Sequence, residues 1–360
     1  MADPWMVDMI SLPDDSTSAV DRALESVLAR LTERAIPRGS AALALIRAAA
    51  DATSGGKRFR PALVVAAFQA FGGRADGSAA GLWDVAAAFE LLHTAFVIHD
   101  DLIDRDIERR GVPNVGGAFR ERARALGVEA DGADRVGDAA AVLAGDILLY
   151  EAARLVAVAD IAADQRVPLF SLLDDAVLVS AIGELADVEQ AVVPSEPDTA
   201  QLLGTAHDKT AVYSFCAPLS AGAVLAGADV GDRAVLSSAG ADLGLAFQLV
   251  DDLIGTFGSE AQAGRGAGAD LREAKRTPLI SFARESPAWP QVSSALAMAP
   301  TGPIAVQAAQ RELDASGARD RLVMLIAQNL ASARRRAAEL PTEPRNLIER
   351  LAAGIEGRIP

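Results

Sequence analysis

The stretches AFVIHDDLI (Ala95–Ile103) and AFQLVDDLI (Ala246–Ile254) are nearly identical, and each is an apolar, helix-like run that carries two adjacent aspartates near its end. An aspartate pair at the apolar end of a helix is costly to desolvate unless a cation or a hydrogen-bond donor balances it. Clusters of carboxylate oxygens suit Mg²⁺ bridged to a phosphate. The two stretches therefore predict core helices and two acidic clusters that can share one diphosphate.

The rest of the sequence favours an all-α fold. Ala and Leu dominate, 4% of the 360 residues are aromatic, and the β-branched alternation of a sheet is hard to find. We expect residues 1–17 to form a disordered tail and residues 18–360 to form a single all-helical domain. Glycine and proline clusters, among them Gly127–Gly137 and Gly255–Gly268, predict the breaks between helices. The expected helices are Val20–Arg34, Ala41–Ala52, Pro61–Phe71, Ala80–Asp104, Ala139–Val158, Leu169–Val192, Ala200–Pro218, Asp232–Thr256, Leu271–Arg284 and Arg319–Glu339.

Composition and charge limit the classes of function. The 49 Asp and Glu residues outnumber the 34 Lys and Arg residues, which disfavours a nucleic-acid-binding surface. The single cysteine, Cys216, excludes an internal disulfide, and the acidic start lacks the features of a signal peptide, so we expect a cytoplasmic protein. The uncharged segment Thr210–Ala228 is about long enough to span a membrane, but Pro218 near its middle favours two buried helices over a membrane span.

The first acidic cluster consists of Asp100, Asp101 and Asp104. Positions i and i+4 lie on one face of a helix, so Asp100 and Asp104 project together and Asp101 flanks them. Acidic residues at a helix end are usually just solvated. Here the preceding run, Phe89–His99, is apolar enough to be buried, which favours a functional site.

The second acidic cluster consists of Asp251 and Asp252. Gln248 lies one turn earlier, and Gly255 stands where a third aspartate would match the first cluster. Fewer carboxylates predict a weaker isolated metal site, which a substrate phosphate would complete. Asp270 follows after a glycine-rich loop.

Basic residues are interleaved with the two acidic clusters. The loop GGKRFRP (Gly55–Pro61) places Lys57 and Arg60 just before a helix that we expect to open with Pro61, an arrangement typical of an anion site. Basic pairs are usually just solvated, but their order along the chain indicates a site for a diphosphate. The other basic sites are Arg109-Arg110, Lys209-Thr210 and Lys275-Arg276.

The histidines suggest a rival hypothesis, a metal-dependent phosphohydrolase. His99-Asp100 and His207-Asp208 could be its paired metal ligands. That interpretation leaves the glycine-lysine loop and the second aspartate pair without roles, so the diphosphate site is the better interpretation. No Ser-His-Asp or Cys-His arrangement is evident, and Cys216 is interpreted as a packing residue.

In order along the chain, these motifs resemble those of the trans-type isoprenyl diphosphate synthases, or polyprenyl synthetases. The resemblance covers residues 41 to 280 and is specific because so many motifs match in order. It implies an antiparallel helical bundle around a deep central apolar cavity, usually a homodimer, with both aspartate clusters at the cavity mouth. The motifs are GGKRFRP (Gly55–Pro61), LLHTAFVIHDDLIDRD (Leu91–Asp106), RRGVP (Arg109–Pro113), LAGD (Leu143–Asp146), GELAD (Gly183–Asp187), HDKTAVYSF (His207–Phe215), FQLVDD (Phe247–Asp252) and DLREAKRT (Asp270–Thr277).

The resemblance implies a Mg²⁺-dependent condensation of isopentenyl diphosphate with an allylic diphosphate, and it implies the residues involved. The metal ligands would be Asp100, Asp101, Asp104, Asp251 and Asp252. The allylic diphosphate would be bound with the help of Arg109, Lys209 and Lys275, and the diphosphate of isopentenyl diphosphate by Lys57, Arg60, His93 and Arg110. Lys209, Thr210 and Gln248 would stabilise the carbocation or orient the leaving group.

Two positions depart from the family pattern. Gly255 replaces the last aspartate of the second DDxxD motif, and Arg265 stands where a lysine is common. Related bacterial members resemble this chain in having DDxxG, so we expect an active enzyme whose changed metal cluster could lower turnover.

The resemblance implies that the growing chain runs down the cavity along the first aspartate helix, so the residues about one helical turn, or ~6 Å, deeper than Asp100 would limit product length. Ala95 and Phe96 lie there, and a ring beside a methyl group predicts partial blocking of the cavity. This favours geranylgeranyl diphosphate over farnesyl diphosphate as the product. In the alternative interpretation, Phe96 is a core-packing residue.

Two further hypotheses stay open. A class I terpene cyclase of related fold would ionise the same substrates, but the residues after Asp251 lack its metal motif. A non-catalytic subunit of a heteromeric synthase would be expected to carry damaged aspartates, whereas the first cluster is intact.

Overall fold

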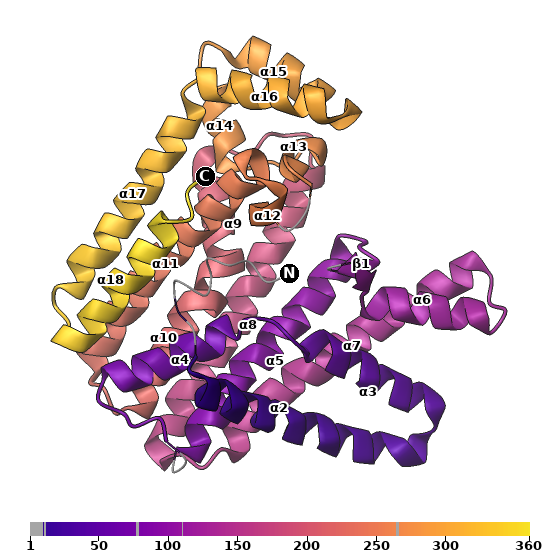
Figure 1. Cartoon of the computed structure of the whole chain (residues 1–360), viewed down its shortest axis with the longest axis vertical. Coiled ribbons are helices and arrows are strands. Elements are labelled where there is room, and N and C mark those ends of the chain that lie inside the picture. Colours follow the sequence, from indigo (N-terminus) through magenta and orange to yellow (C-terminus); the bar gives the residue numbers. More distant parts are fainter. Residues whose placement is uncertain (1–9, 11, 77–78, 110, 264–265) are drawn as a thin grey trace. The chain divides into compact units, whose positions relative to one another are not determined.

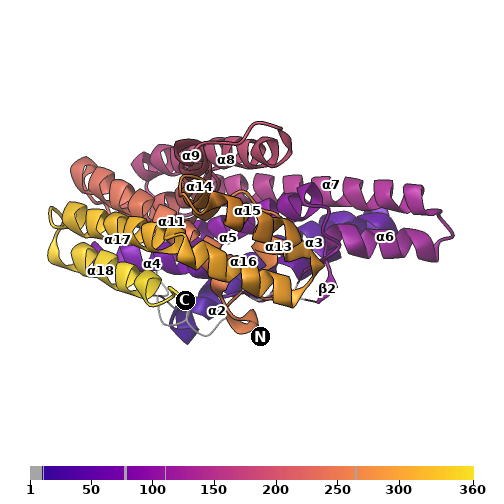
Figure 2. The ribbon, with the colours of Figure 1, turned by 90° about the horizontal axis from the view of Figure 1, so that it is seen from above.

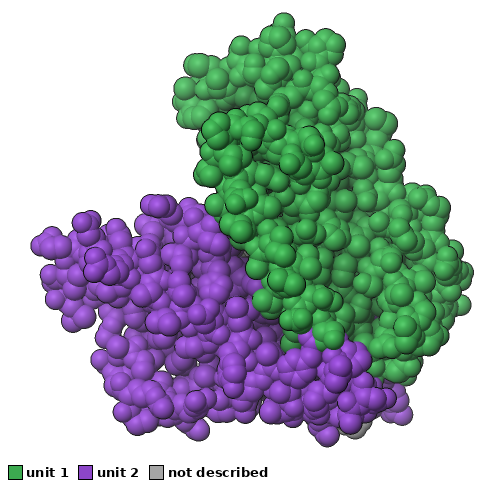
Figure 3. Space-filling view, turned by 180° about the vertical axis from the view of Figure 1, so that it is seen from behind, with its two compact units in different colours: residues 1–10, 70–72, 171–360 green, residues 11–69, 73–170 purple. Residues whose placement is uncertain are grey.

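The computed structural model describes residues 10, 12–76, 79–109, 111–263 and 266–360. The chain divides into two compact units, which Figure 3 colours separately. Unit 2 comprises residues 11–69 and 73–170, and unit 1 comprises residues 1–10, 70–72 and 171–360. Most of the described residues are helical, which confirms the predicted all-α class.

Unit 2 consists of helices and one short hairpin. Its α-helices are α2 (Asp14–Ala35), α3 (Ser40–Thr53), α4 (Phe59–Ala70), α5 (Ala80–Ile103), α6 (Val115–Ala125) and α7 (Ala130–Val158). A 3₁₀ turn, η1 (Ile36–Arg38), joins α2 to α3, and the antiparallel strands β1 (Glu108–Arg109) and β2 (Val112–Pro113) form the hairpin. Helix α2 begins at Asp14, four residues before the predicted start of the domain at residue 18. Residues 1–9 and 11 of the predicted tail lie outside the described residues.

Helix α7 packs against α5 and α6, which lie beside it in Figures 1 and 2. Glycines allow the close contacts, because a Cβ added at Gly145 would lie 2.1 Å from His99 Nε2, and one at Gly137 would lie 2.6 Å from the Gly116 carbonyl oxygen. The prediction of a break over residues 127–137 is therefore wrong for most of that segment. The chain turns at Gly127, where φ is 83°, and α7 then runs through Gly137.

Unit 1 begins within α8 (Ala163–Val192), whose first residues belong to unit 2. The π-helix η2 (His207–Cys216) lies between α9 (Thr199–Ala206) and α10 (Ala217–Leu225). The remaining elements are α11 (Val230–Phe257), α12 (Glu260–Ala263), α13 (Ala269–Arg272), α14 (Pro278–Arg284), α15 (Trp289–Met298), the 3₁₀ turn η3 (Ala299–Thr301), α16 (Pro303–Ala315), α17 (Ala318–Ala337) and α18 (Thr342–Glu356).

Helix α11 forms the core of unit 1. Leu243, Leu249 and Leu253 on this helix are fully buried, and α17 and α18, yellow in Figure 1, pack along it. The π-helix also packs against α11, and a Cβ added at Gly244 would lie 2.5 Å from the Cα of Ala211. Close packing of this kind holds the polar residues of both helices in fixed positions.

In unit 1, two predictions of where helices are continuous or broken are wrong. The segment expected to break into two helices at Pro218 stays helical, and its winding changes there: the Ala217 N–H donates to the Val212 carbonyl five residues earlier, in the π-helical pattern. The helix expected over Leu271–Arg284 is interrupted between α13 and α14. Ala274 has a φ of 52°, a left-handed conformation that a helix does not accommodate.

Within the described part of the chain, one helical segment, Gly81–Ile103 of α5, is long and apolar enough to cross a membrane. Most of its apolar window, 72%, is buried inside the protein. The buried core helix of a water-soluble protein has the same length and composition, so the segment is weak evidence for a membrane span.

Candidate active site

The first acidic cluster lies at the C-terminal end of α5. Asp104 caps the helix, and its backbone N–H donates to the carbonyl oxygen of Asp100 (2.8 Å). Carboxylates at this end of a helix meet the negative end of the helix dipole, so they need a nearby cation. Arg109 provides one: its Nε donates to Asp101 Oδ1 (2.9 Å), and its Nη2 lies 3.8 Å from Asp100 Oδ2. The structure therefore brings the predicted diphosphate ligand Arg109 to the first cluster.

Burial shapes the chemistry of this cluster. Asp101 is 5% exposed, and burial raises the pKa of its carboxyl group above its usual value, although Arg109 opposes the rise. Asp104 is exposed and Asp100 is half-buried. Two carboxylates are thus accessible to a ligand while the third is held against an arginine.

The hairpin that follows α5 positions Arg109. Arg109 in β1 pairs with Val112 in β2. Asn114, directly after the hairpin, donates from its side chain to the Asp106 carbonyl oxygen (2.8 Å) and accepts from the Gly117 N–H (2.8 Å), which caps α6. Sequence analysis missed this role of Asn114, although an asparagine before a helix is a recognisable cap signal. Arg110 lies outside the described residues.

The glycine-lysine loop turns one of its basic residues inward. Gly55 and Gly56 have φ of 69° and 83°, and Arg58 has a φ of 51°. The Arg58 side chain is 8% exposed, and it donates from Nε to Asp21 Oδ1 (2.9 Å) and from Nη1 to Glu90 Oε1 (2.9 Å). Arg58 therefore fastens the loop to α2 and α5, a role that the sequence did not indicate.

The other two basic residues of the loop, Lys57 and Arg60, are half-buried. Helix α4 begins at Phe59, two residues earlier than predicted, so Pro61 lies inside its first turn. Proline is tolerated there because the first helical N–H groups have no intrahelical acceptor. Glu90, which accepts a hydrogen bond from Arg58, lies one turn before His93 on the same face of α5. The loop therefore reaches the part of α5 that carries His93.

The predicted product-length residues occupy different environments on α5. Ala95 is fully buried, whereas Phe96 is half-buried. Leu91 and Leu92, one turn earlier, are fully buried. Of the two, Phe96 keeps an accessible surface.

The second acidic cluster lies on α11 and is fixed by a chain of hydrogen bonds. Thr210 Oγ1 donates to Gln248 Oε1 (2.8 Å), and Gln248 Nε2 donates to Asp252 Oδ1 (3.1 Å). The structure thus joins three predicted site residues in one network. Lys275 Nζ lies 3.9 Å from Asp252 Oδ1, where the resemblance implied a cation.

Asp252 is the most perturbed carboxylate of the site. It is 4% exposed, and burial raises the pKa of its carboxyl group to about 7; Lys275 lowers the pKa and the charge of Asp270 raises it. Asp251 is half-buried and contacts Arg358, which follows α18. Arg358 could not be predicted from the sequence, because no local motif marks it.

Lys209, on the π-helix, is held by two carboxylates of α8. Its Nζ lies 3.0 Å from Glu184 Oε2 and 2.8 Å from Asp187 Oδ2. Gly183 allows this approach, because a Cβ there would lie 2.4 Å from the Lys209 backbone nitrogen. The motif GELAD, to which the sequence assigned no chemistry, thus positions the predicted cation. π-Helical turns are frequent at functional sites.

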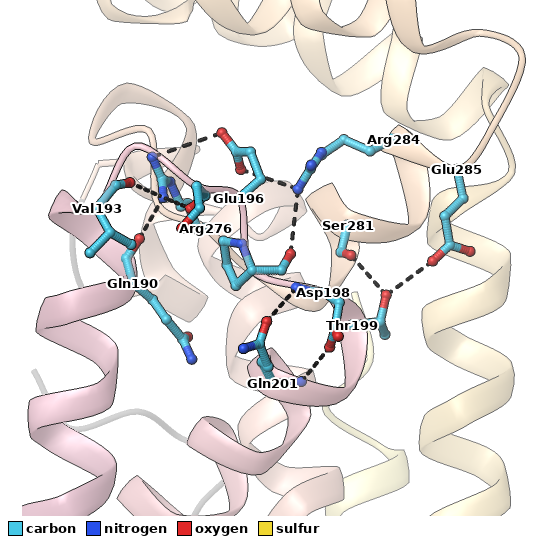
Figure 4. Close-up of polar contacts among 12 residues, drawn as sticks. Gln190, Val193, Glu196, Asp198, Thr199, Gln201, Arg276, Ser281, Arg284 and Glu285 are labelled. Atoms are coloured by element: carbon cyan, nitrogen blue, oxygen red, sulfur yellow. Dashed lines mark hydrogen bonds and ion pairs between the residues drawn. The ribbon is translucent and has the colours of Figure 1, made fainter.

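Arg276, next to Lys275, has a structural role. Figure 4 shows its Nη1 donating to the carbonyl oxygens of Gln190 (2.6 Å) and Val193 (3.0 Å), at the end of α8. Glu196 in the same connection contacts Arg276 and Arg284. This arginine closes the connection between α8 and α9.

The geometry weighs against the rival phosphohydrolase hypothesis. His99 Nε2 lies 3.3 Å from the Val142 carbonyl oxygen and 3.6 Å from Asp146 Oδ1, so its ring contacts α7. Burial raises the pKa of Cys216 to about 12, which keeps the thiol protonated and supports its interpretation as a packing residue.

The donors of both clusters suit a hard divalent cation. They are carboxylate oxygens, the ligands that Mg²⁺ prefers. Across the described ranges, no three or more His, Cys, Asp or Glu side chains are gathered closely enough to hold a metal ion. Oxygens of a diphosphate would add to these carboxylates as ligands, as the sequence predicts for the second cluster.

Comparisons with known proteins agree with this fold. They define an all-α protein of the isoprenoid synthase class. The chain belongs to the polyprenyl synthetase family, whose model matches residues 44–313.

Among characterised relatives, the geranylgeranyl diphosphate synthase of Sulfolobus acidocaldarius is 32% identical over 232 residues, and the alignment spans 63% of each chain. The farnesyl diphosphate synthase of Bacillus subtilis is 35% identical over 62% of this chain and 70% of its own. The aligned part is thus less than two thirds of the Sulfolobus protein. The geranylgeranyl pyrophosphate synthase of Corynebacterium glutamicum, solved with isoprenyl diphosphate and magnesium, superposes with a TM-score of 0.86 at 28% identity, covering 96% of this chain and 99% of its own.

Proposed function

We propose that this chain is a Mg²⁺-dependent trans-prenyltransferase that condenses isopentenyl diphosphate with an allylic diphosphate. The observation that carries the proposal is the pair of acidic clusters, each on a buried helix and each next to basic side chains. Arg109 contacts Asp101, and Lys275 lies near Asp252. Membership of the polyprenyl synthetase family supports the same chemistry.

The acidic clusters would hold the ion that accompanies the allylic diphosphate. Bound Mg²⁺ would stabilise the negative charge that develops on the departing diphosphate. The ligands are Asp100, Asp101, Asp104, Asp251 and Asp252. Arg109, Lys209 and Lys275 bind the diphosphate oxygens and, because they are already oriented by carboxylates, need little reorganisation when the charge develops.

Isopentenyl diphosphate would bind at the glycine-lysine loop. Lys57 and Arg60 bind its diphosphate with His93 and Arg110. Arg58 does not bind the substrate; it keeps the loop in place through Asp21 and Glu90. A fixed loop loses less entropy on binding, which favours both affinity and orientation.

No protein nucleophile takes part in the reaction. Ionisation of the allylic C–O bond gives a carbocation, which the double bond of isopentenyl diphosphate attacks, and the released diphosphate accepts the proton that is then lost. Together with Lys209, Thr210 and Gln248 would stabilise the carbocation or orient the leaving group. The hydrogen bond between Thr210 and Gln248, and the one from Gln248 to Asp252, support this role. Exclusion of water by the buried helices protects the carbocation from hydrolysis.

Geranylgeranyl diphosphate is the proposed product. Fully buried Ala95 and half-buried Phe96 lie about one turn before Asp100 and would limit the length of the growing chain. We also propose that the protein acts in the cytoplasm as a homodimer, as the family resemblance implies.

A product assay tests the proposed function. Purified protein with Mg²⁺ and labelled isopentenyl diphosphate is given dimethylallyl, geranyl or farnesyl diphosphate in turn, and the dephosphorylated alcohols are sized. We expect a C20 alcohol that an Asp100→Ala variant fails to form. A hydrocarbon formed without isopentenyl diphosphate would establish a terpene cyclase instead. No turnover with any starter would favour the non-catalytic subunit.

A further inference from the structure

Two Gly-Asp steps lie eight residues apart on α7 and have no part in the proposed chemistry. Gly137-Asp138 and Gly145-Asp146 are about two helical turns from each other, and in both steps the glycine is buried and the aspartate is exposed. The second step belongs to the motif LAGD (Leu143–Asp146), to which the proposed function gives no role. Each step lies against a side chain from a neighbouring helix.

The second Gly-Asp step receives His99 from α5. A Cβ added at Gly145 would lie 2.1 Å from Nε2, 2.5 Å from Cδ2 and 2.8 Å from Cε1 of His99, so only glycine leaves room for the ring. His99 Nε2 lies 3.3 Å from the Val142 carbonyl oxygen, three positions before the glycine, and 3.6 Å from Asp146 Oδ1, one position after it. We call Val142, Gly145 and Asp146 the histidine socket.

The first Gly-Asp step receives Arg120 from α6 in the same pattern. A Cβ added at Gly137 would lie 2.7 Å from Arg120 Cγ and 3.2 Å from its Nε. Arg120 donates from Nε to Asp134 Oδ1 (3.1 Å), three positions before the glycine, and from Nη2 to Asp138 Oδ1 (2.6 Å), one position after it. We call Asp134, Gly137 and Asp138 the arginine socket. A buried glycine with acceptors at the same two offsets thus occurs twice on α7.

Surface charge alone does not explain the arginine socket. Ion pairs between exposed side chains contribute little to stability, and both aspartates of this socket are exposed. The Arg120 side chain, in contrast, is only 12% exposed, and it has two carboxylate partners. A side chain held over a buried glycine, with an acceptor on each side, has little freedom to turn or slide. Both sockets therefore fix where a neighbouring helix lies on α7.

The histidine socket fixes the end of α5 that carries the first acidic cluster. His99 directly precedes Asp100 and Asp101 in this helix. Successive residues of a helix project about 100° apart, so the ring can face α7 while the carboxylates project in other directions. A ring seated in the socket holds the backbone of the cluster in one register along α7.

The arginine socket fixes the hairpin that follows the first acidic cluster. Arg120 fastens α6 along α7, which lies beside it in Figure 1, and the start of α6 in turn holds the hairpin. Asn114 donates to the Asp106 carbonyl oxygen (2.8 Å), and a Cβ added at Gly117 would lie 2.1 Å from the Ile107 carbonyl oxygen. The segment that leads into β1 therefore rests on α6.

Helix α6 also lies close to the cluster itself. Arg120 and Asp101 line the same small cavity, of about 10 Å³. The Asp106 N–H donates to the Asp101 carbonyl oxygen (2.8 Å), which joins the hairpin to the end of α5. A shift of α6 would thus move Arg109, in β1, relative to Asp101.

We propose that His99 and Arg120 are positioning residues for the first acidic cluster. Seated in the histidine socket, His99 orients the helix end that carries Asp100 and Asp101. Seated in the arginine socket, Arg120 orients the hairpin that brings Arg109 to Asp101. These roles rest on the proposed function, in which the first cluster binds Mg²⁺ and the allylic diphosphate, and they give the LAGD motif a purpose.

A double-variant comparison in the histidine socket separates positioning from packing. Gly145→Ala pushes the ring out, His99→Ala empties the socket, and in Gly145→Ala/His99→Ala a methyl group occupies part of the space of the lost ring. The melting temperature without metal reports packing. Steady-state kinetics with Mg²⁺ report the KM for geranyl diphosphate and the KM for isopentenyl diphosphate separately.

We expect Gly145→Ala to lower the melting temperature and the double variant to recover it, because the clash is gone. All three variants should raise the KM for geranyl diphosphate about 10- to 100-fold, as is usual when a group that orients a metal ligand is lost. The KM for isopentenyl diphosphate should stay near the wild-type value. A double variant that recovers the KM for geranyl diphosphate together with its melting temperature would overturn the role of His99, and so would an equal rise of both KM values.

A second set of variants tests the arginine socket. Arg120→Met removes the donors, Arg120→Lys keeps a cation, and Arg124→Met replaces an exposed arginine one turn further along α6 as the matched control. Amide hydrogen exchange of residues 101–109, measured without metal or substrate, reports how firmly the hairpin is held.

Exchange in this segment should be faster in Arg120→Met, intermediate in Arg120→Lys and unchanged in Arg124→Met, and the KM for geranyl diphosphate should follow the same order. Wild-type exchange in a folded Arg120→Met protein would overturn the role of Arg120. A wild-type protein that elongates no allylic substrate would instead count against the proposed function, and the exchange rates would still decide whether Arg120 holds the hairpin.

Discussion

The guanidinium of Arg358 contacts the Asp251 carboxylate and lies 4.2 Å from the centroid of the Phe247 ring. Arg358 is 4% exposed, and it comes from the segment after α18, 107 positions away from Asp251. A predicted metal ligand is thus neutralised by a cation of the chain itself. The ring beneath the guanidinium adds a cation–π contact to the ion pair.

Replacing Arg358 should strengthen metal binding. In Arg358→Gln, Asp251 loses its cation and presents a more negative site, so we expect the affinity for Mg²⁺ alone to rise several-fold, where tenfold corresponds to about 1.4 kcal/mol. Titration calorimetry without substrate measures this. Arg319→Gln is the control, because Arg319 donates to the Pro360 carbonyl oxygen (2.6 Å) in the same segment without contacting Asp251. Equal or weaker Mg²⁺ affinity in Arg358→Gln would show that the arginine does not compete with the ion.

The raised pKa of Asp252 predicts a pH-dependent stability. The folded state holds the proton up to about pH 7, whereas the unfolded chain releases it near the ordinary value of 3.8. Between these values the folded state binds more protons, so this group lowers the free energy of unfolding as pH rises, by about 1.4 kcal/mol per pH unit.

Asp252→Asn removes that titration and keeps an acceptor for Gln248. From about pH 4 to pH 7, the free energy of unfolding of the wild type should fall relative to that of the variant. Above pH 7 the difference between the two proteins should stay constant. Urea unfolding across this range without divalent metal measures it. A difference independent of pH would mean that Asp252 has an ordinary pKa.

Replacing Arg58 should destabilise the fold directly and affect catalysis only indirectly. Arg58→Ala leaves Glu90 buried without its arginine, which costs about 3–5 kcal/mol of unfolding free energy. The loosened loop should raise the KM for isopentenyl diphosphate more than it lowers kcat. The double variant Arg58→Met/Glu90→Gln should regain stability but not the low KM. An unchanged KM in a folded Arg58 variant would contradict the positioning role.

Product length should respond to the residues before Asp100. Phe96→Ala removes a ring and should shift the product toward longer prenyl chains, whereas Ala95→Phe should shorten it. Chromatographic sizing of the dephosphorylated alcohols measures both shifts. Identical products from both variants would mean that Phe96 serves as core packing, the alternative interpretation of this position.

The acidic clusters and the glycine-lysine loop could be predicted because their signals are local. Helical periodicity and apolar context place Asp100, Asp101, Asp251 and Asp252 at the ends of buried helix segments, and the structure has them there. Gln248 follows from Asp252 by helical spacing alone. Such patterns depend only on residues within one or two helical turns of each other, so they can be recognised in the sequence alone.

The remaining parts depend on contacts between distant segments. Arg58 looks like its basic neighbours in sequence, and its positive φ and distant carboxylates turn it inward. Arg358 and Asp270 reach the second cluster from other elements. Glycine is common both in turns and where two helices pack closely, so Gly137 alone does not distinguish a helix break from a helix contact. In the structure Gly137 lies within α7 and allows close packing against α6.

Both acidic clusters should act on one diphosphate, and a double-mutant cycle measures whether they do. The rate of prenyl chain elongation, as kcat/KM for the allylic substrate, is measured for Asp100→Ala, Asp251→Ala and the double variant. Each single variant should lose about 10²- to 10³-fold, several kcal/mol of transition-state stabilisation. Groups that act as a unit are non-additive, so the double variant should be little worse than either single variant. A loss in the double variant equal to the product of the two single losses would mean that the two clusters act independently and not on one diphosphate.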